Sequence, residues 1–76
     1  MVNAKVNALG GEYVNGQKLR DIRRKSGKTM RQISREADVT ETQIYQIESG
    51  ATKNPRIETL IGLAKALDCE IVDFLE

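Results

Sequence analysis

A capping signature that occurs twice, eleven residues apart, is the strongest constraint on the fold of this chain. Thr29 precedes Gln32 by three residues, and Thr40 precedes Gln43 by the same interval. In such a capping box, the hydroxyl and amide side chains each bond a backbone N–H group that the first helical turn leaves unpaired. Each pair predicts the start of a helix, so the helix that begins after Thr29 must end near Ala37.

The segment between these two helices is correspondingly short, with Asp38 and Val39 as its turn. Two helices of about eight residues joined by a turn of three or four cannot lie antiparallel along a bundle. They cross steeply instead, in the geometry of a helix-turn-helix. Apolar residues at helical spacing supply the inner faces of the pair: Met30, Ile33 and Ala37 in one helix, and Ile44 and Ile47 in the other.

Helical periodicity continues on both sides of this pair. A first helix is predicted over 16–25, with Leu19 and Ile22 on one face and Gly27 just past its end. The third helix stops at Ser49 and Gly50, and Pro55 leads into a fourth helix over 56–67. Its apolar stripe comprises Ile57, Leu60, Ile61, Ala64 and Leu67, and a short fifth helix is marked by Ile71, Phe74 and Leu75. The predicted fold is all-α, a compact five-helix domain over 15–76.

Residues 1–14 show no helical period and include the pair Gly10 and Gly11. We expect a flexible arm there. A short strand or a docked segment is the alternative, because the arm carries four apolar residues: Val2, Val6, Leu9 and Val14.

Composition excludes several classes of function. The 76 residues contain no histidine and one cysteine, so neither an internal disulfide nor a metal site is expected. We find no nucleophile–base constellation and no glycine-rich phosphate loop, and therefore expect no enzyme, cofactor or small-molecule substrate. No apolar stretch approaches the ~18 residues that cross a membrane, and no secretory signal is visible. The cytoplasm is the expected compartment.

Charge is unevenly distributed along the chain, although the net charge is only +1. Between residues 18 and 35, Asp21 alone opposes the basic residues Lys18, Arg20, Arg23, Arg24, Lys25, Lys28, Arg31 and Arg35. Acidic residues predominate over 36–76. One end of the molecule can therefore present a positive face to a polyanion, although helix faces that are merely solvated would show the same pattern.

The stretch TMRQISREADVTETQIYQIESG, residues 29–50, resembles the helix-turn-helix of lambda-type repressors and Cro proteins. The resemblance extends from about Asn15 to Leu75 and includes Arg23, Ser34, Val39, Pro55 and the closing ALDCEIVDFL. It implies a lambda-repressor-like fold and a sequence-specific DNA-binding transcriptional regulator, in most cases a repressor. The expected partner is double-stranded DNA carrying an inverted-repeat operator, bound by a homodimer with the third helix in the major groove.

Four positions depart from the family pattern. Met30 stands where a phosphate-binding glutamine is common, and Lys28 stands where an apolar residue often precedes the second helix. Asp38 replaces the usual turn glycine, and aspartate tolerates a left-handed backbone better than most residues. Cys69 replaces a usual valine, and we expect a buried inert thiol there rather than a redox switch.

The third helix should carry the residues that read bases. With Ile44 and Ile47 buried, Gln46 could pair with an adenine edge, Glu41 could accept from a cytosine amine, and Thr42 could touch a thymine methyl. Glu41 would also stabilise the helix dipole without DNA. Three further residues have either a DNA contact or a structural role, namely capping for Thr40 and Gln43 and surface packing for Tyr45.

The resemblance also implies which residues flank the groove and hold the fold together. Contacts to the DNA backbone are expected from Arg31, Ser49, Lys53, Asn54 and Arg56. The first helix would add Arg20, Arg24, Lys25 and Lys28 if its face is turned toward the duplex. A buried ion pair is expected between Arg23 and Glu48. Candidates for a dimer patch are Leu63, Ile71, Val72 and Leu75, with core positions as the alternative. The competing functional hypothesis is a protein-interaction module, such as an antitoxin, with weak or no DNA binding.

Overall fold

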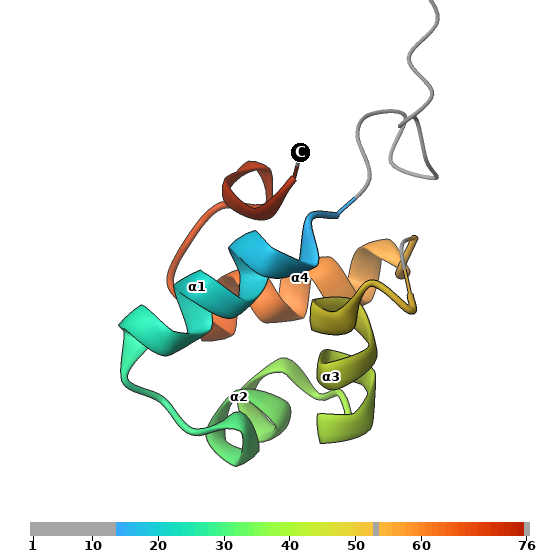
Figure 1. Cartoon of the computed structure of the whole chain (residues 1–76). Helices are drawn as coiled ribbons and strands as arrows, with labels where there is room; N and C mark the ends of the chain where they lie inside the picture. The colour runs from blue at the N-terminus through green and yellow to red at the C-terminus, as the bar shows by residue number, and fades with distance from the viewer. Residues whose placement is uncertain (1–13, 53, 76) are drawn as a thin grey trace, which may run out of the picture.

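Side-chain capping bonds mark the start of three of the four long helices in this computed structural model, which describes residues 14–52 and 54–75. The helices are α1 (Gly16–Ser26), α2 (Met30–Ala37), α3 (Glu41–Ser49) and α4 (Ile57–Ala66), followed by a 3₁₀ turn, η1 (Ile71–Phe74). Figure 1 shows α2 and α3 running in clearly different directions below α1 and α4, with the C-terminal turn on the far side of α1. None of the helices in these two ranges is long and apolar enough to span a membrane.

Both predicted capping boxes are confirmed. Gln32 N donates to Thr29 Oγ1 at 3.1 Å, and Thr29 N donates to Gln32 Oε1 at 3.0 Å. In the second box the corresponding bonds measure 3.0 and 2.8 Å, with Thr40 and Gln43 as partners. Two orphan N–H groups are thus satisfied at the start of each helix, which explains why α2 and α3 begin where the sequence predicts.

The turn between α2 and α3 depends on the left-handed backbone of Asp38 and on the side chain of Ser34. Asp38 takes the left-handed conformation, with φ 58°, at the position where the family usually has glycine. Val39 N donates to Ser34 O at 3.1 Å, and Ser34 Oγ donates to Val39 O at 2.5 Å. The small Ser34 side chain therefore fastens the turn to α2 and sets the direction in which α3 leaves it.

The C-terminal helix prediction needs correction, because the described residues hold four α-helices and not five. The segment Ile71–Phe74 is a 3₁₀ helix, with Asp73 N bonded to Glu70 O and Leu75 N to Val72 O. An α-helix cannot continue past Phe74, because Leu75 is extended and forms an antiparallel bridge with Val14. The 3₁₀ turn still buries Phe74 completely.

The boundary of the N-terminal arm also needs correction. Val14, which was predicted to belong to the arm, is 6% exposed in the hydrophobic core, and Asn15 N donates to Phe74 O at 2.8 Å. The two ends of the folded domain are thus joined to each other, and the packed domain includes Val14. The remainder of the predicted arm, 1–13, lies outside the described residues.

Twelve hydrophobic residues form one buried cluster, to which α1, α2, α3, α4 and the C-terminal turn all contribute. The apolar stripe predicted for α4 is only partly in this core. Leu60, Ala64 and Leu67 are buried, whereas Ile57 and Ile61 are 44% and 42% exposed. A helical stripe wider than the face that its neighbours cover leaves its edge in solvent.

The predicted ion pair between Arg23 and Glu48 is confirmed and is bidentate. Arg23 Nε lies 2.5 Å from Glu48 Oε2, and Arg23 Nη2 lies 2.9 Å from Oε1. The Glu48 side chain is completely buried. The hydrogen bonds to Glu48 raise the pKa of the Arg23 guanidinium despite its partial burial, so the guanidinium stays protonated. Arg20 adds a weaker contact at 3.5 Å. The pair joins α1 to the end of α3.

Lys28 has a structural role that accounts for its departure from the family pattern. Its Nζ donates at 2.6 Å both to Glu36 Oε1 and to Ala66 O, the last carbonyl of α4. A cation at this position satisfies a carbonyl that the helix itself leaves unpaired, and it is favoured by the negative end of the helix dipole. Lys28 thereby links α2 to α4.

Cys69 is partly rather than fully buried, and it packs against the core. Burial raises the pKa of its thiol, and the negative charges of Asp73, Asp68 and Glu70 act in the same direction. A raised pKa keeps the sulfur protonated near neutral pH, and the thiolate is the reactive form. These surroundings agree with an inert thiol.

Candidate nucleic-acid interface

The outward face of α3 is polar and open to solvent. Ile44, Ile47 and Glu48 form the buried side of the helix, whereas the residues predicted to read bases are exposed. Neither Gln46 nor Thr42 has a side-chain hydrogen bond to any other described residue. Their donors and acceptors are therefore available to a ligand, and no contact within the fold explains these residue types.

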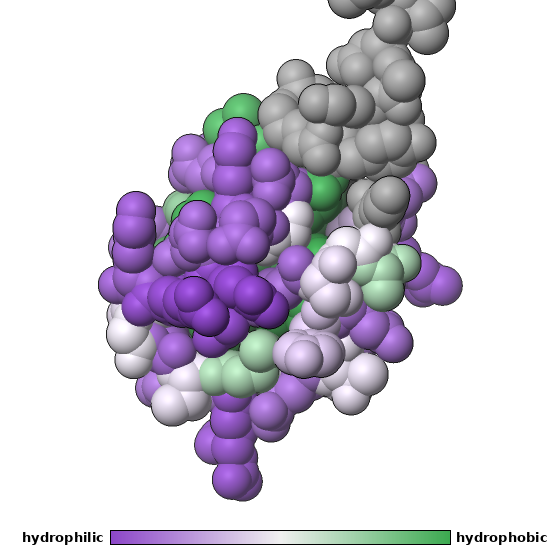
Figure 2. All heavy atoms as spheres, viewed as in Figure 1, coloured by the Kyte–Doolittle hydropathy of each residue, from purple (hydrophilic) through white to green (hydrophobic). Residues whose placement is uncertain are grey.

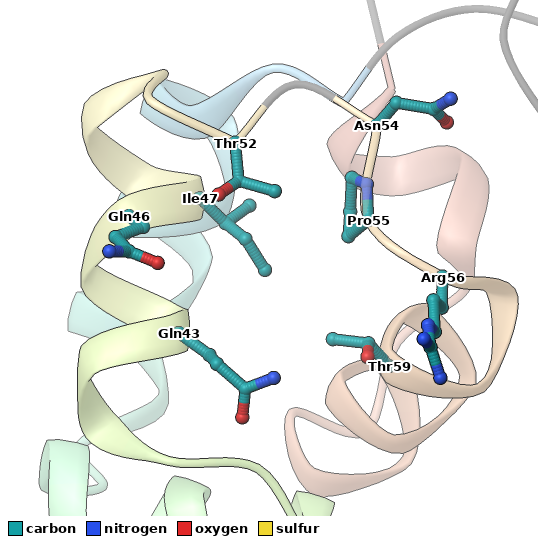
Figure 3. A pocket seen from close by; sticks show the side chains of 8 residues that line it. All are labelled: Gln43, Gln46, Ile47, Thr52, Asn54, Pro55, Arg56 and Thr59. Atoms are coloured by element: carbon teal, nitrogen blue, oxygen red, sulfur yellow. The ribbon is translucent and has the colours of Figure 1, made fainter.

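Thr40 and Gln43 have the capping role that was one of their two predicted roles, since together they form the capping box of α3. Gln43 uses its Oε1 for this bond. Its amide nitrogen makes no hydrogen bond within the described ranges, and Figure 3 shows the side chain pointing away from α3 toward Thr59 on α4. Gln43 can therefore cap the helix and donate to a ligand at the same time.

A hollow of about 250 Å³ separates α3 from the start of α4. Figure 3 shows α3 side chains along one wall, the loop above, and the first turn of α4 along the other wall. The lining residues are Gln43, Gln46, Ile47, Thr52, Asn54, Pro55, Arg56 and Thr59. We call this the α3–α4 hollow. It brings together residues that were predicted separately as base-reading and backbone-binding.

Hydrogen bonds to the end of α3 hold the loop beside this hollow. Thr52 N donates to Gln46 O at 3.0 Å, and Ser49 Oγ donates to the same carbonyl at 3.2 Å. On the opposite wall, α4 starts after Arg56, whose side chain makes no capping hydrogen bond. The first N–H groups of α4 and the exposed Arg56 guanidinium thus lie on the same side of the hollow.

The other backbone candidates are more dispersed. Asn54 is exposed and lines the hollow, and Arg31 is exposed in the first turn of α2. Lys53 lies outside the described residues. Of the first-helix cluster, Arg20 and Lys28 are engaged in the contacts described above, whereas Arg24 and Lys25 remain exposed. The sequence did not predict Thr52 and Thr59 as part of this surface, because neither belongs to a motif or to a charged cluster.

A second hollow lies at the start of α3, beside α2. Its lining residues are Met30, Glu41, Thr42 and Tyr45. We call this the α2–α3 hollow. At about 100° per residue, these α3 positions occupy one side of the exposed face, and Gln43 and Gln46 occupy the other. The outward face of α3 is therefore flanked by two hollows of different chemistry, one bordered by Arg56 and the other by Glu41.

The candidate dimer patch is smaller than predicted. Leu63 is completely buried in the core of the monomer, so its side chain offers no surface to a second copy. Ile71 and Leu75 are partly buried against the same core, and Val72 is 68% exposed. Figure 2 shows a mostly hydrophilic surface on the visible face, with hydrophobic atoms at the surface in small patches. No cluster of three or more potential metal ligands occurs in the described ranges.

The chain is similar to a helix-turn-helix family and to several solved regulators. Residues 19–74 match the family described as helix-turn-helix. The P22 c2 repressor, solved in complex with a synthetic operator, is 30% identical, with 80% of this chain and 91% of that chain covered and a TM-score of 0.72. The restriction-modification controller protein C.AhdI from Aeromonas hydrophila is 26% identical, with 76% and 86% covered and a TM-score of 0.70. The clp gene regulator ClgR from C. glutamicum is also 26% identical, with 76% and 74% covered and a TM-score of 0.68. No curated protein matches the sequence at a significant level.

Proposed function

The chain belongs to the helix-turn-helix family, and on that premise we propose that it is a transcriptional regulator, in its simplest form a repressor, that binds DNA by inserting α3 into the major groove. The observation that carries this proposal is the outward face of α3. The side chains of its exposed Gln46 and Thr42 make no hydrogen bond to other described residues, and Gln46 lines a hollow bordered by an arginine. Two solved relatives named as a repressor with its operator and as a controller protein support the same function.

The two walls of the α3–α4 hollow suit different parts of a duplex. Gln46 on α3 has the bidentate amide that pairs with an adenine edge, while the start of α4 supplies N–H groups and Arg56. Helix N-termini and arginine side chains both favour phosphate oxygens. We therefore assign base reading to α3 and backbone anchoring to the loop and the first turn of α4.

One variant on each wall of the α3–α4 hollow should distinguish base reading from backbone anchoring. Gln46→Ala is expected to lower affinity for the preferred site by about 1–3 kcal/mol and to leave nonspecific affinity almost unchanged. Arg56→Ala should weaken binding to all sequences alike and reduce the slope of log K against log salt by about one. The measurement is a titration of selected and scrambled duplexes at several salt concentrations. Equal loss on both duplexes for Gln46→Ala would contradict base reading by α3.

The same titration tests the proposed function as a whole. Phosphate-driven binding weakens steeply as ionic strength rises, so any helix-turn-helix that binds DNA should retain random duplexes at low salt. If the protein retains neither random nor selected DNA at low salt, DNA binding is excluded. The fold would then serve as a protein-interaction module such as an antitoxin.

We further propose a symmetric dimer on an inverted repeat, because one recognition helix reads too few base pairs for useful specificity. The C-terminal turn offers the contact surface, with Val72 as its most exposed apolar side chain. A two-fold axis there would place the two α3 helices about 34 Å apart, one turn of duplex.

Val72→Glu should shift the protein toward monomer and weaken operator binding at least about tenfold, because two buried carboxylates would face each other across the axis. The fold should survive, since Val72 is 68% exposed in the monomer. Ile61→Glu on α4 is the matched control, because this isoleucine is also exposed but lies outside the proposed patch. Sedimentation at several concentrations decides the question, and a wild-type monomer at every concentration would contradict the dimer.

A further inference from the structure

The α2–α3 hollow differs from its neighbour in ways that exclude the DNA backbone as its ligand. None of its four lining side chains is basic, and Glu41 contributes a carboxyl group. A phosphate placed there would meet a carboxylate and no cation. The hollow nevertheless adjoins Thr42 on the outward face of α3, which is the face we propose to enter the major groove. A base edge is therefore the part of a duplex that fits this hollow.

The walls of the hollow are suited to a small apolar group. Met30 is partly buried and packs against the core, so its side chain is held in place. Tyr45 is 61% exposed and forms the facing side, with Thr42 beside it. In unmodified DNA the one methyl group on a base edge in the major groove is that at C5 of thymine. 5-Methylcytosine carries the same group at the same ring position. The sequence showed Met30 only as a departure from the family pattern, and the fold gives it these neighbours.

Glu41 restricts which hydrogen-bonding group a bound base can present to the hollow. An exposed carboxylate accepts hydrogen bonds and does not donate them, so it favours an exocyclic amine and disfavours carbonyl and ring-nitrogen acceptors. We propose that the α2–α3 hollow binds the C5 methyl group of a pyrimidine, with Glu41 accepting from an amine beside that methyl. This inference rests on the proposed function and assigns Met30 and Tyr45 a part in sequence specificity.

Two kinds of base pair present a C5 methyl close to an amine. In an A·T pair the methyl belongs to thymine and the amine to adenine. In a pair that contains 5-methylcytosine, one base carries both groups. Unmodified G·C pairs have the amine without the methyl. The two sources share the same contact chemistry, and substitutions in the DNA distinguish them.

The test uses a duplex that carries the sequence selected by the protein from a random pool. Thymines are replaced one at a time by uracil, which removes only the methyl group. Cytosines are replaced one at a time by 5-methylcytosine, which adds only that group. We expect one position in each half-site where the methyl changes affinity about fourfold, the value of burying one methyl group. A loss with uracil identifies thymine as the ligand, and a gain with 5-methylcytosine identifies the modified base.

Protein variants then test whether the α2–α3 hollow contacts the methyl group at that position of the duplex. Met30→Ala should reduce the fourfold methyl effect to about one, whereas the fold, monitored by thermal unfolding, should persist because Met30 is only partly buried. Arg31→Ala is the matched control, since Arg31 is the next residue of α2 but does not line the hollow. It should lower affinity for every duplex and keep the methyl effect. Glu41→Gln should relax the preference for an amine, because glutamine also donates.

The outcomes separate this inference from the proposed function. If the protein binds the selected duplex but no methyl position alters affinity, or if Met30→Ala keeps the full methyl effect, the methyl-binding hollow is excluded while DNA binding stands. If no duplex is bound at low salt, DNA binding itself is excluded, and the hollow has no base to read.

Discussion

Arg23→Ala is expected to lower the free energy of unfolding by about 3–5 kcal/mol, because it leaves a buried carboxylate without its main partner. The Glu48 side chain is completely buried, and both of its oxygens accept from the Arg23 guanidinium. Arg20 cannot replace these bonds, since its Nε lies 3.5 Å from Oε1 and its side chain is one-third exposed. Urea unfolding followed by circular dichroism measures the change.

Two further variants make this prediction specific to the pair. Arg20→Ala should lower the free energy of unfolding by less than about 1 kcal/mol, as is usual for a partly exposed ion pair with a long contact distance. The double variant Arg23→Met with Glu48→Leu should recover much of the loss, since apolar groups of similar size remove the uncompensated charge. A nearly neutral Arg23→Ala, or a double variant as unstable as the single one, would show that the ion pair does not stabilise the fold.

Gly62→Ala is expected to destabilise the protein by about 2–3 kcal/mol, in the upper part of the range for overpacking. A Cβ atom at this position would lie 2.5 Å from the carbonyl oxygen of Ala37 and 3.3 Å from its carbon. These are backbone atoms, so no change of rotamer relieves the clash, and α4 must move away from α2. In an open helix the same substitution would be favourable by about 0.8–1.0 kcal/mol, because alanine is the better helix former.

The effect should reach the DNA-binding surface. Ala37 is the last residue of α2 and immediately precedes the turn that directs α3, so displacement at Gly62 changes the position of α3, the helix proposed to read bases. We expect Gly62→Ala to weaken specific binding even below its unfolding temperature. Lys65→Ala, an exposed change on the same helix, is the control and should alter stability by less than about 0.5 kcal/mol. An unaltered unfolding midpoint for Gly62→Ala would contradict the close approach of α2 and α4.

Several residues of the α3–α4 hollow were proposed from the sequence one at a time, but their grouping around one hollow was not predicted. Gln46, Asn54 and Arg56 were each assigned to DNA, and their arrangement around one hollow depends on the packing of α4 beside α3. Thr52 and Thr59 line the same hollow without any sequence signal. Met30 and Tyr45 lie on different helices, and only the crossing of α2 and α3 makes them neighbours.

The predicted dimer patch shows that the periodicity of apolar residues does not by itself predict which of them are buried. A helical stripe identifies the apolar side of α4, but it does not tell which of its residues the neighbouring elements cover. Leu63, predicted at an interface, is completely buried, whereas Ile57 and Ile61, predicted in the core, are more than 40% exposed. Burial is decided by the positions of α2 and η1 relative to α4, which the sequence pattern does not specify.

By itself the sequence determined where α2 and α3 begin, where α1 ends, and how short the turn between α2 and α3 must be. These features follow from the two capping boxes, whose bonds join residues three positions apart, and from Gly27, which takes the left-handed conformation just past α1. Only the tertiary structure decided that Gly62 permits two backbones to meet, that Val14 pairs with Leu75, and that two hollows of different chemistry flank α3. Local hydrogen bonds can be recognised from spacing along the chain, whereas contacts between distant segments depend on how the whole core packs.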